Sequence, residues 1–132
     1  MRIPSWLEPE LADPERRRAR VTKTFAKLPR LGVAIFCDAA DRNQCVQFVA
    51  SENGTLVMEL DCGASRGSGG FDSVQLEGLA GRGFRLTHYG NGRREGVPND
   101  PEALVAEVED LFRSILRRPP NFRLRVYSGR GG

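Results

Sequence analysis

The chain has few of the residues on which catalytic and metal sites are usually built. Its 132 residues include one His, three Cys and one Trp, and only two of its 20 cationic residues are Lys. No apolar run approaches the roughly 20 residues of a membrane-spanning helix, and residues 1–6 are too short and too polar for the core of a signal peptide. These absences predict a cytoplasmic protein that does not enter a membrane.

What is present is typical of one globular domain over residues 1–132. The length is enough to bury about two thirds of the unfolded chain's surface, so no metal or disulfide is needed to hold a core. The net charge is +3 and Arg supplies 18 of the 20 cations, a bias that we attribute to a GC-rich genome. The odd number of cysteines, each within or beside an apolar run, predicts reduced and buried thiols at Cys37, Cys45 and Cys62.

The clearest pattern is a set of three consecutive strand-like runs at residues 32–37, 45–50 and 55–61. Between the last two, Asn53-Gly54 is the preferred pair for a two-residue type I′ turn, because both of its central positions need a positive φ. The second and third runs alternate apolar residues with mixed ones, as expected when helices cover only one side of a sheet. The pattern therefore predicts an antiparallel meander with one apolar face.

Three segments have helical patterns: residues 13–28, a short segment from residue 72 that ends at Gly81 or Gly83, and residues 100–116. The first begins with Asp13 as N-cap and a proline in the first turn, and its apolar residues recur at helical spacing. The second begins with a capping box formed by Asp72 and Gln75. The third carries the longest apolar stripe in the chain.

Further strands are expected at residues 84–89, 93–97 and 122–127. The resulting order is α-β-β-β-α-β-β-α with an extra C-terminal strand. This order predicts an α+β fold, a two-layer sandwich in which an antiparallel sheet has helices packed mainly on one face. An N-terminal arm (residues 1–12) and a mobile glycine-rich loop (residues 63–70) complete the expected domain.

No pattern predicts a catalytic centre, a cofactor site or a metal site. The three cysteines and His88 could supply four ligands, but zinc sites generally use closely spaced cysteine pairs, and these cysteines are separated by seven and 16 residues. The glycine-rich loop lacks the glycine-lysine-serine pattern of a phosphate-binding loop. We therefore expect no enzymatic activity, with a small hydrolase using His88 or Cys45 as the enzyme alternative.

A run of arginines at residues 16–20 could contact phosphates, since a few Arg contacts give useful non-specific affinity. No RNA-recognition aromatic motif and no helix-turn-helix pattern accompanies the run. We therefore expect a solvated helix face and no nucleic-acid partner. The alternative is a basic nucleic-acid-binding module that uses Arg16, Arg17, Arg18 and Arg20.

Candidate binding residues lie on the sheet face that the helices are not expected to cover. The first group is Gln47, Val49, Val57 and Glu59. The second group is Arg123, Arg125 and Tyr127. The arginines of the second group suit an acidic or extended partner, through charge-assisted hydrogen bonds and strand addition.

Several segments together resemble a known family. They are the helix end at residues 28–32, the strand at residues 45–50 (CVQFVA), the strand at residues 54–59 (GTLVME), residues 79–84 and the helix over residues 100–116. In this arrangement the chain resembles the TY-Chap family, the type III secretion chaperone-like domains, over residues 6–116.

The resemblance implies a small α+β domain, often dimeric, that performs no chemistry and holds a segment of another protein on its exposed sheet face or edge. The basic balance of this chain indicates a client with acidic segments. We expect a non-enzymatic chaperone or adaptor for one dedicated partner protein, an effector-like protein or a peptide-modifying enzyme encoded nearby, and it could act as a homodimer. The alternative within the binding class is an immunity protein that neutralises a toxin.

Overall fold

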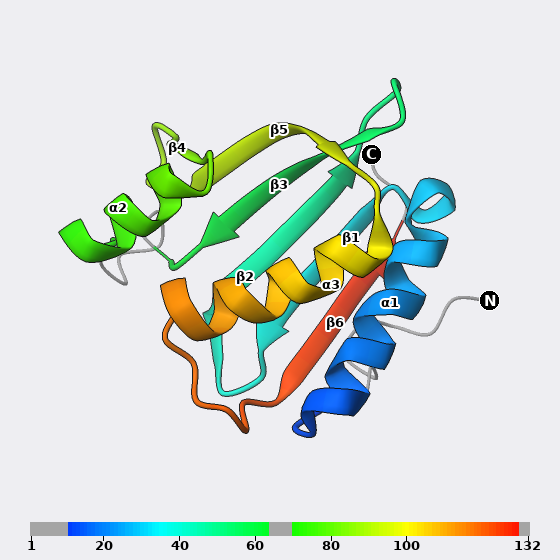
Figure 1. Cartoon of the computed structure of the whole chain (residues 1–132), viewed down its shortest axis with the longest axis horizontal. Coiled ribbons are helices and arrows are strands. Elements are labelled where there is room, and N and C mark those ends of the chain that lie inside the picture. The colour runs from blue at the N-terminus through cyan, green and yellow to red at the C-terminus, as the bar shows by residue number, and fades with distance from the viewer. Residues whose placement is uncertain (1–10, 64–69, 130–132) are drawn as a thin grey trace.

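The computed structural model, which describes residues 11–63 and 70–129, is an antiparallel sheet with helices on one face (Figure 1). In chain order the elements are α1 (Pro14–Leu31), β1 (Val33–Asp38), β2 (Asp41–Ala50), β3 (Thr55–Asp61), α2 (Ser73–Gly81), β4 (Arg85–Leu86), β5 (Gly92–Pro98), α3 (Pro101–Asp110), a π-helical turn η3 (Leu111–Ile115) and β6 (Leu124–Gly129). This is the predicted α+β order with its extra C-terminal strand.

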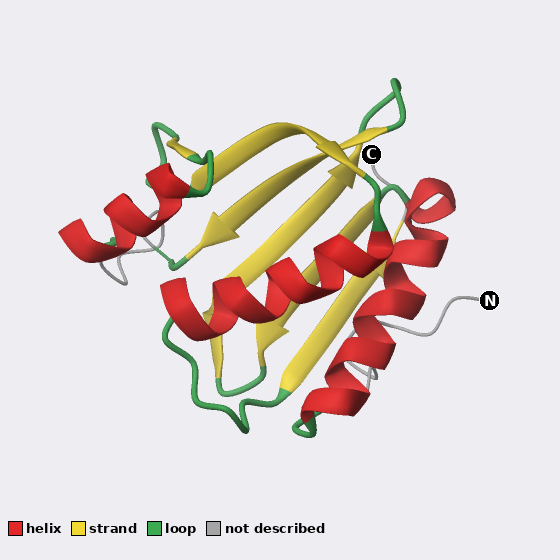
Figure 2. Cartoon of the chain, in the orientation of Figure 1, coloured by secondary structure: helices red, strands yellow, loops and turns green. Residues whose placement is uncertain are grey.

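The six strands are arranged in the order β4-β5-β3-β2-β1-β6, and all neighbours are antiparallel. β1, β2 and β3 therefore form the predicted meander, and the C-terminal strand β6 joins the sheet beside β1. Both long helices, α1 and α3, cross the same face, as Figure 2 shows. Most of the N-terminal arm and of the glycine-rich loop predicted at residues 63–70 lies outside the described residues.

The core forms between this face and the two helices, because alternate residues of each strand point toward them. Phe36 of β1 and Phe48 of β2 are fully buried against Phe25 of α1, with ring centroids 4.8 to 6.0 Å apart. The same face buries three residues of β3: Leu56, Met58 and Leu60. The predicted apolar face of the meander is therefore confirmed.

The turn between β2 and β3 differs from the predicted type I′ turn. Its loop has three residues, Glu52 to Gly54, and the N–H of Ser51 donates to the carbonyl of Thr55 at 2.9 Å. Gly54 alone of the three has a positive φ, at 84°, whereas a type I′ turn needs one at both central positions. The side chain of Asn53 instead accepts a hydrogen bond from the amide of Thr55 at 3.1 Å. The predicted hairpin is confirmed, and the predicted turn type is wrong.

The strand expected at residues 84–89 is much shorter in the structure. Only Arg85–Leu86 pairs with β5, because the chain already turns at Thr87. There the N–H of Thr87 donates to the carbonyl of Asn91 at 2.7 Å, and the N–H of Gly90 donates to the carbonyl of Thr87 at 3.0 Å. These bonds close a loop where the sequence had indicated alternating strand positions.

The last helix also departs from the expected continuous α-helix over residues 100–116. Its final turn, η3, is π-helical, and the N–H of Leu116 donates to the carbonyl of Leu111, five residues back, at 2.9 Å. Arg117 then adopts a left-handed conformation with φ of 57°, and the N–H of Arg118 donates to the carbonyl of Phe112 at 2.8 Å. The wider turn ends the helix and directs the chain toward β6.

Arg17 contradicts the expectation that the whole arginine run is solvated. Its side chain is 1% exposed and donates to both carboxylate oxygens of Glu109, at 2.8 and 3.3 Å. It also donates to the carbonyls of Ala12, Phe122 and Pro120 at 2.7 to 3.0 Å, and its guanidinium stacks on the Phe122 ring at 4.1 Å. Arg17 therefore ties α1, α3 and the loop before β6 together.

Polar contacts dock α2 against the end of the last helix. The predicted capping box is confirmed, with reciprocal hydrogen bonds between Asp72 and Gln75. The side-chain amide of Gln75 (Nε2) also donates to the backbone carbonyl of Ile115 at 2.7 Å. Arg82 donates to Asp110 at 2.8 Å, and this bond is the main reason that the pKa of Asp110 is lowered.

Candidate functional site

The sheet face opposite the two long helices carries the candidate binding residues. Four aliphatic side chains of β1, β2 and β3 that point to this face are half-buried: Val33, Ile35, Val49 and Val57. They form an apolar surface that α1 and α3 do not cover (Figure 1). We call it the open face.

The open face contains a hollow of about 200 Å³. Its lining residues are Gln47, Val49, Val57, Glu59 and Arg93. The strand register explains this grouping, because Gln47 stands opposite Glu59, Glu59 opposite Arg93, and Val49 opposite Val57. All four residues of the first predicted group therefore line one hollow, with two valines on one side and an amide, a carboxylate and a guanidinium on the other.

Arg93 is the charged centre of the hollow. It donates to Glu59 at 2.6 Å through Nη1 and to Glu95, the next outward-pointing residue of β5, at 2.9 Å through Nε. These hydrogen bonds raise the pKa of Arg93, with the bond to Glu59 as the larger cause. The same contacts lower the pKa of Glu95, chiefly through its hydrogen bond with Arg93. The guanidinium is therefore held in place by carboxylates on both sides.

Arg93→Gln is expected to raise the pKa of Glu95 toward its ordinary value of 4.5, because the main hydrogen bond that stabilises the carboxylate is lost. Because the pKa of Glu95 is lower in the folded chain than in the unfolded chain, its carboxylate stabilises the fold at a pH above the unfolded pKa. This contribution is lost as the pH falls through the folded pKa. Titration of the Glu95 carboxyl by NMR measures the shift. Arg85→Gln is the matched control and should move the same pKa less, because Arg85 is the weaker contributor. Equal shifts in the two variants would contradict this geometry.

Arg93 is the residue of this hollow that sequence reasoning missed. Its strand is separated from β3 by α2 and β4, yet it pairs directly with β3 in the sheet. The sequence does show that Arg93 and Glu95 alternate along a strand after a glycine-rich turn. A pairing of Arg93 with Glu59 could be inferred only if the two strands were known to be neighbours. Pairing between strands distant in sequence was not predicted.

The second predicted group lies apart from the hollow. Tyr127 of β6 stands opposite Ile35 and Arg125 opposite Cys37, whereas Arg123 precedes β6. With strands about 4.8 Å apart, β6 is roughly 14 Å across the sheet from β3. The edge of β6 is also partly occupied, because Leu11 forms a β-bridge with Leu124. The two predicted groups therefore share the open face and not one pocket.

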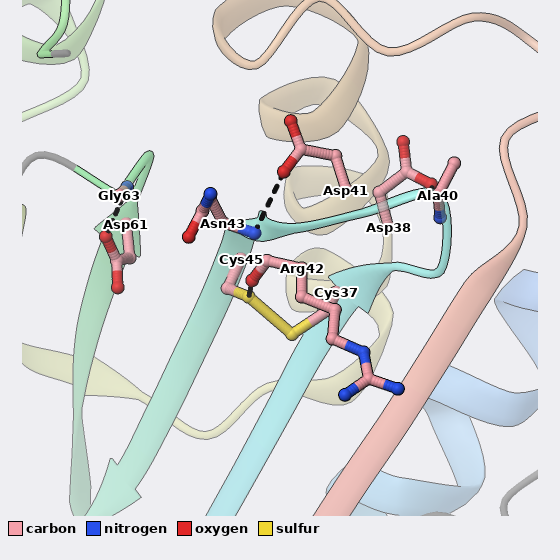
Figure 3. The surroundings of a disulfide bond; sticks show 9 residues. All are labelled: Cys37, Asp38, Ala40, Asp41, Arg42, Asn43, Cys45, Asp61 and Gly63. Carbon is pink, nitrogen blue, oxygen red and sulfur yellow. Dashed lines mark hydrogen bonds between the residues drawn. A yellow bond between two sulfur atoms is a disulfide. The ribbon is translucent and has the colours of Figure 1, made fainter. Parts of the chain in front are cut away.

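Two of the three cysteines are not the thiols that the sequence predicts. Cys37 and Cys45 stand directly opposite each other on β1 and β2 and are joined by a disulfide. Figure 3 shows this disulfide in front of the strands with helix ribbons behind them, so it lies on the open face. Cys62 is buried and lies outside the disulfide. The expectation of a reduced pair fails because the register places the two sulfurs in contact.

The remaining ligand candidates do not come together. His88 lies in the loop after β4 with its ring 5.4 Å from that of Tyr89. Within residues 11–63 and 70–129, no group of three His, Cys, Asp or Glu side chains could hold a metal ion. The helices of the same segments also include none that is both long and apolar enough to cross a membrane.

The cations of α1 whose side chains the structure describes differ in exposure. Arg17 is buried, as described above, whereas Arg16, Arg20, Lys23 and Lys27 follow a helical spacing of four, three and four residues along one side of α1. Arg16, Lys23 and Lys27 are exposed and Arg20 is half-buried. Arg18 is also exposed, on another side of α1, so Arg17 alone of the original arginine run is out of reach of a polyanion. Nucleic-acid binding stays a prediction.

Comparison of the chain with protein-family models, with curated proteins and with solved structures finds no match. The site must therefore be interpreted from its own geometry.

Proposed function

We propose that this domain is a non-enzymatic chaperone or adaptor that binds a segment of one dedicated partner protein on its open face. The observation that carries the proposal is the hollow lined by Gln47, Val49, Val57, Glu59 and Arg93. It lies in an apolar, half-buried surface on the side of the sheet opposite α1 and α3. A sheet face with half-buried apolar side chains gains free energy when a partner covers the rest of their surface.

The size of the open face favours a segment over a whole folded partner. Five strands from β6 to β5 span about 20–24 Å, and five residues along a strand span about 17 Å. The product, about 400 Å², is half of the roughly 800 Å² that each side of a standard protein interface buries. One helix or one extended segment fits this area.

The chemistry of the hollow suits a side chain with an apolar stem and a polar end. Val49 and Val57 offer apolar contacts, and the amide of Gln47 both donates and accepts hydrogen bonds. Arg93 already bonds Glu59 and Glu95, so it supplies a fixed guanidinium whose remaining N–H groups can donate. A partner residue inserted there would anchor the segment, as buried hot-spot residues do.

Val57→Arg is expected to weaken partner binding by about tenfold or more, because it places a charge in the centre of the apolar surface. The partner is sought by co-expressing the domain with the proteins encoded beside it, followed by size-exclusion chromatography and titration of the co-eluting complex. Val74→Arg is the matched control, since Val74 lies on α2 and is already 66% exposed. Thermal unfolding of both variants shows whether either loses its fold.

Two results would refute the proposal. One is that no neighbouring gene product co-elutes with the folded domain, and the other is that Val57→Arg and Val74→Arg bind the partner equally. A third result would decide between two roles of the same surface. If the co-eluting partner is a toxin whose activity the domain abolishes, the domain is an immunity protein and not a chaperone or adaptor.

A further inference from the structure

The disulfide lies on the open face, outside the core cluster between the sheet and the two long helices. Cys37 and Cys45 are the last directly opposed pair before the irregular register at the β1–β2 turn, with Cα atoms 4.3 Å apart. Both residues point to the open face, away from α1 and α3 (Figure 3). Their residual exposure is small, 4% for Cys37 and 8% for Cys45. A small reagent therefore suits this site better than the surface of another protein.

The surrounding sheet does not need the disulfide to stay paired. β1 is held on its other side by β6 through six residue pairs, and β2 is held by β3 through six residue pairs. The bond closes a sequence separation of eight residues, and a short loop restrains the unfolded chain less than a long one. Cleavage of the bond should therefore leave the fold intact.

Two arginines lie on the same side of the sheet as the disulfide. Arg125 stands opposite Cys37 on β6, and the exposed side chain of Arg42 lies on the same side of the hairpin as the disulfide (Figure 3). Cations near a sulfur stabilise the thiolate that forms when a disulfide opens. The carbonyl oxygen of Arg42 is 2.9 Å from the sulfur of Cys45, so the protonated thiol of Cys45 has an acceptor already in place.

We propose that Cys37 and Cys45 form a thiol–disulfide exchange site for a small thiol of the glutathione type. The thiolate of the small molecule attacks one sulfur, a mixed disulfide forms, and the other cysteine leaves as a thiolate that takes up a proton. A second small thiol then attacks the mixed disulfide and releases the second cysteine. The small thiols are oxidised to their disulfide, and the protein disulfide receives the two electrons. This inference does not rest on the proposed partner binding.

The test equilibrates the folded full chain in buffers with different ratios of reduced to oxidised glutathione. Acid quenching, alkylation and intact-mass measurement then count the thiols. We expect the doubly reduced form to rise reversibly with reduced glutathione, a glutathione adduct on Cys37 or Cys45 at intermediate ratios, and unchanged circular dichroism. Cys62→Ser is the matched control and should exchange as the wild type does, because Cys62 lies outside the disulfide.

The Cys37→Ser/Cys45→Ser double variant should keep the circular dichroism spectrum and show no exchange. The inference is overturned if the disulfide is reduced only after urea unfolds the chain. It is equally overturned if both cysteines stay alkylatable in fully oxidised glutathione, since the bond then does not form.

Discussion

Arg17→Met is expected to lower the free energy of unfolding by about 3–4 kcal/mol, toward the lower end of the cost of removing one partner from a buried ion pair. The substitution leaves Glu109 without its bidentate partner and three carbonyls, of Ala12, Phe122 and Pro120, without a donor. The Glu109 side chain keeps 22% of its surface exposed, which limits the cost of its charge. The carbonyl of Phe122, whose bond to Arg17 is buried, adds the cost of an acceptor that loses its hydrogen bond.

Urea denaturation followed by circular dichroism measures this effect. Arg18→Met is the matched control, since Arg18 is the exposed neighbour on the same helix, and it should change the free energy of unfolding by less than about 0.5 kcal/mol. Arg17→Met/Glu109→Leu should recover part of the loss, because it removes the uncompensated charge as well. A loss of similar size for Arg17→Met and Arg18→Met would show that Arg17 does not hold the three segments together.

The position of Arg17 on α1 was predictable from the sequence, but its partner was not. Arg17 lies one helical turn before Val21, so it continues the buried stripe of Val21, Phe25 and Leu28. Arginine is rarely buried without a partner, and its partner Glu109 is 92 residues away in the chain. Periodicity could therefore place Arg17 on the inner side of α1, but only the tertiary fold shows what satisfies its charge.

The disulfide marks a second limit of sequence reasoning. A regular hairpin closed by the pair Asp38 and Asp41 would place Cys37 opposite Arg42. The register instead shifts between Cys37 and Asp38, and this shift brings Cys45 opposite Cys37. Alternation of apolar residues predicts which face a side chain takes, but it does not predict an irregularity of the ladder.

The candidate site shows the same division between local and long-range information. Period-two alternation was enough to place Gln47, Val49, Val57 and Glu59 on one face. It was not enough to find Arg93, because the pairing of β3 with β5 skips two elements of the chain. The fold class was predictable because it depends on element order and on one-sided apolar patterns, and both can be read from local sequence.

Phe48→Ala is expected to lower the free energy of unfolding by about 3–5 kcal/mol, the usual cost of truncating a buried phenylalanine. Phe48 is fully buried, and its ring lies 4.8 Å from that of Phe25 and 6.0 Å from that of Phe36. The truncation therefore leaves a cavity where the core is densest in aromatic contacts. Urea denaturation measures the loss.

The adjacent residue provides the control, because successive residues of a strand point to opposite faces. Gln47→Ala removes a half-buried side chain from the open face, and we expect a change of about 0.5 kcal/mol or less in the free energy of unfolding. The same variant should weaken binding of the partner, since Gln47 lines the hollow. A pair of neighbouring substitutions thus separates the two faces of β2: one acts on stability and the other on recognition. If Gln47→Ala unfolds the domain as strongly as Phe48→Ala, the open face is part of the core and not a binding surface.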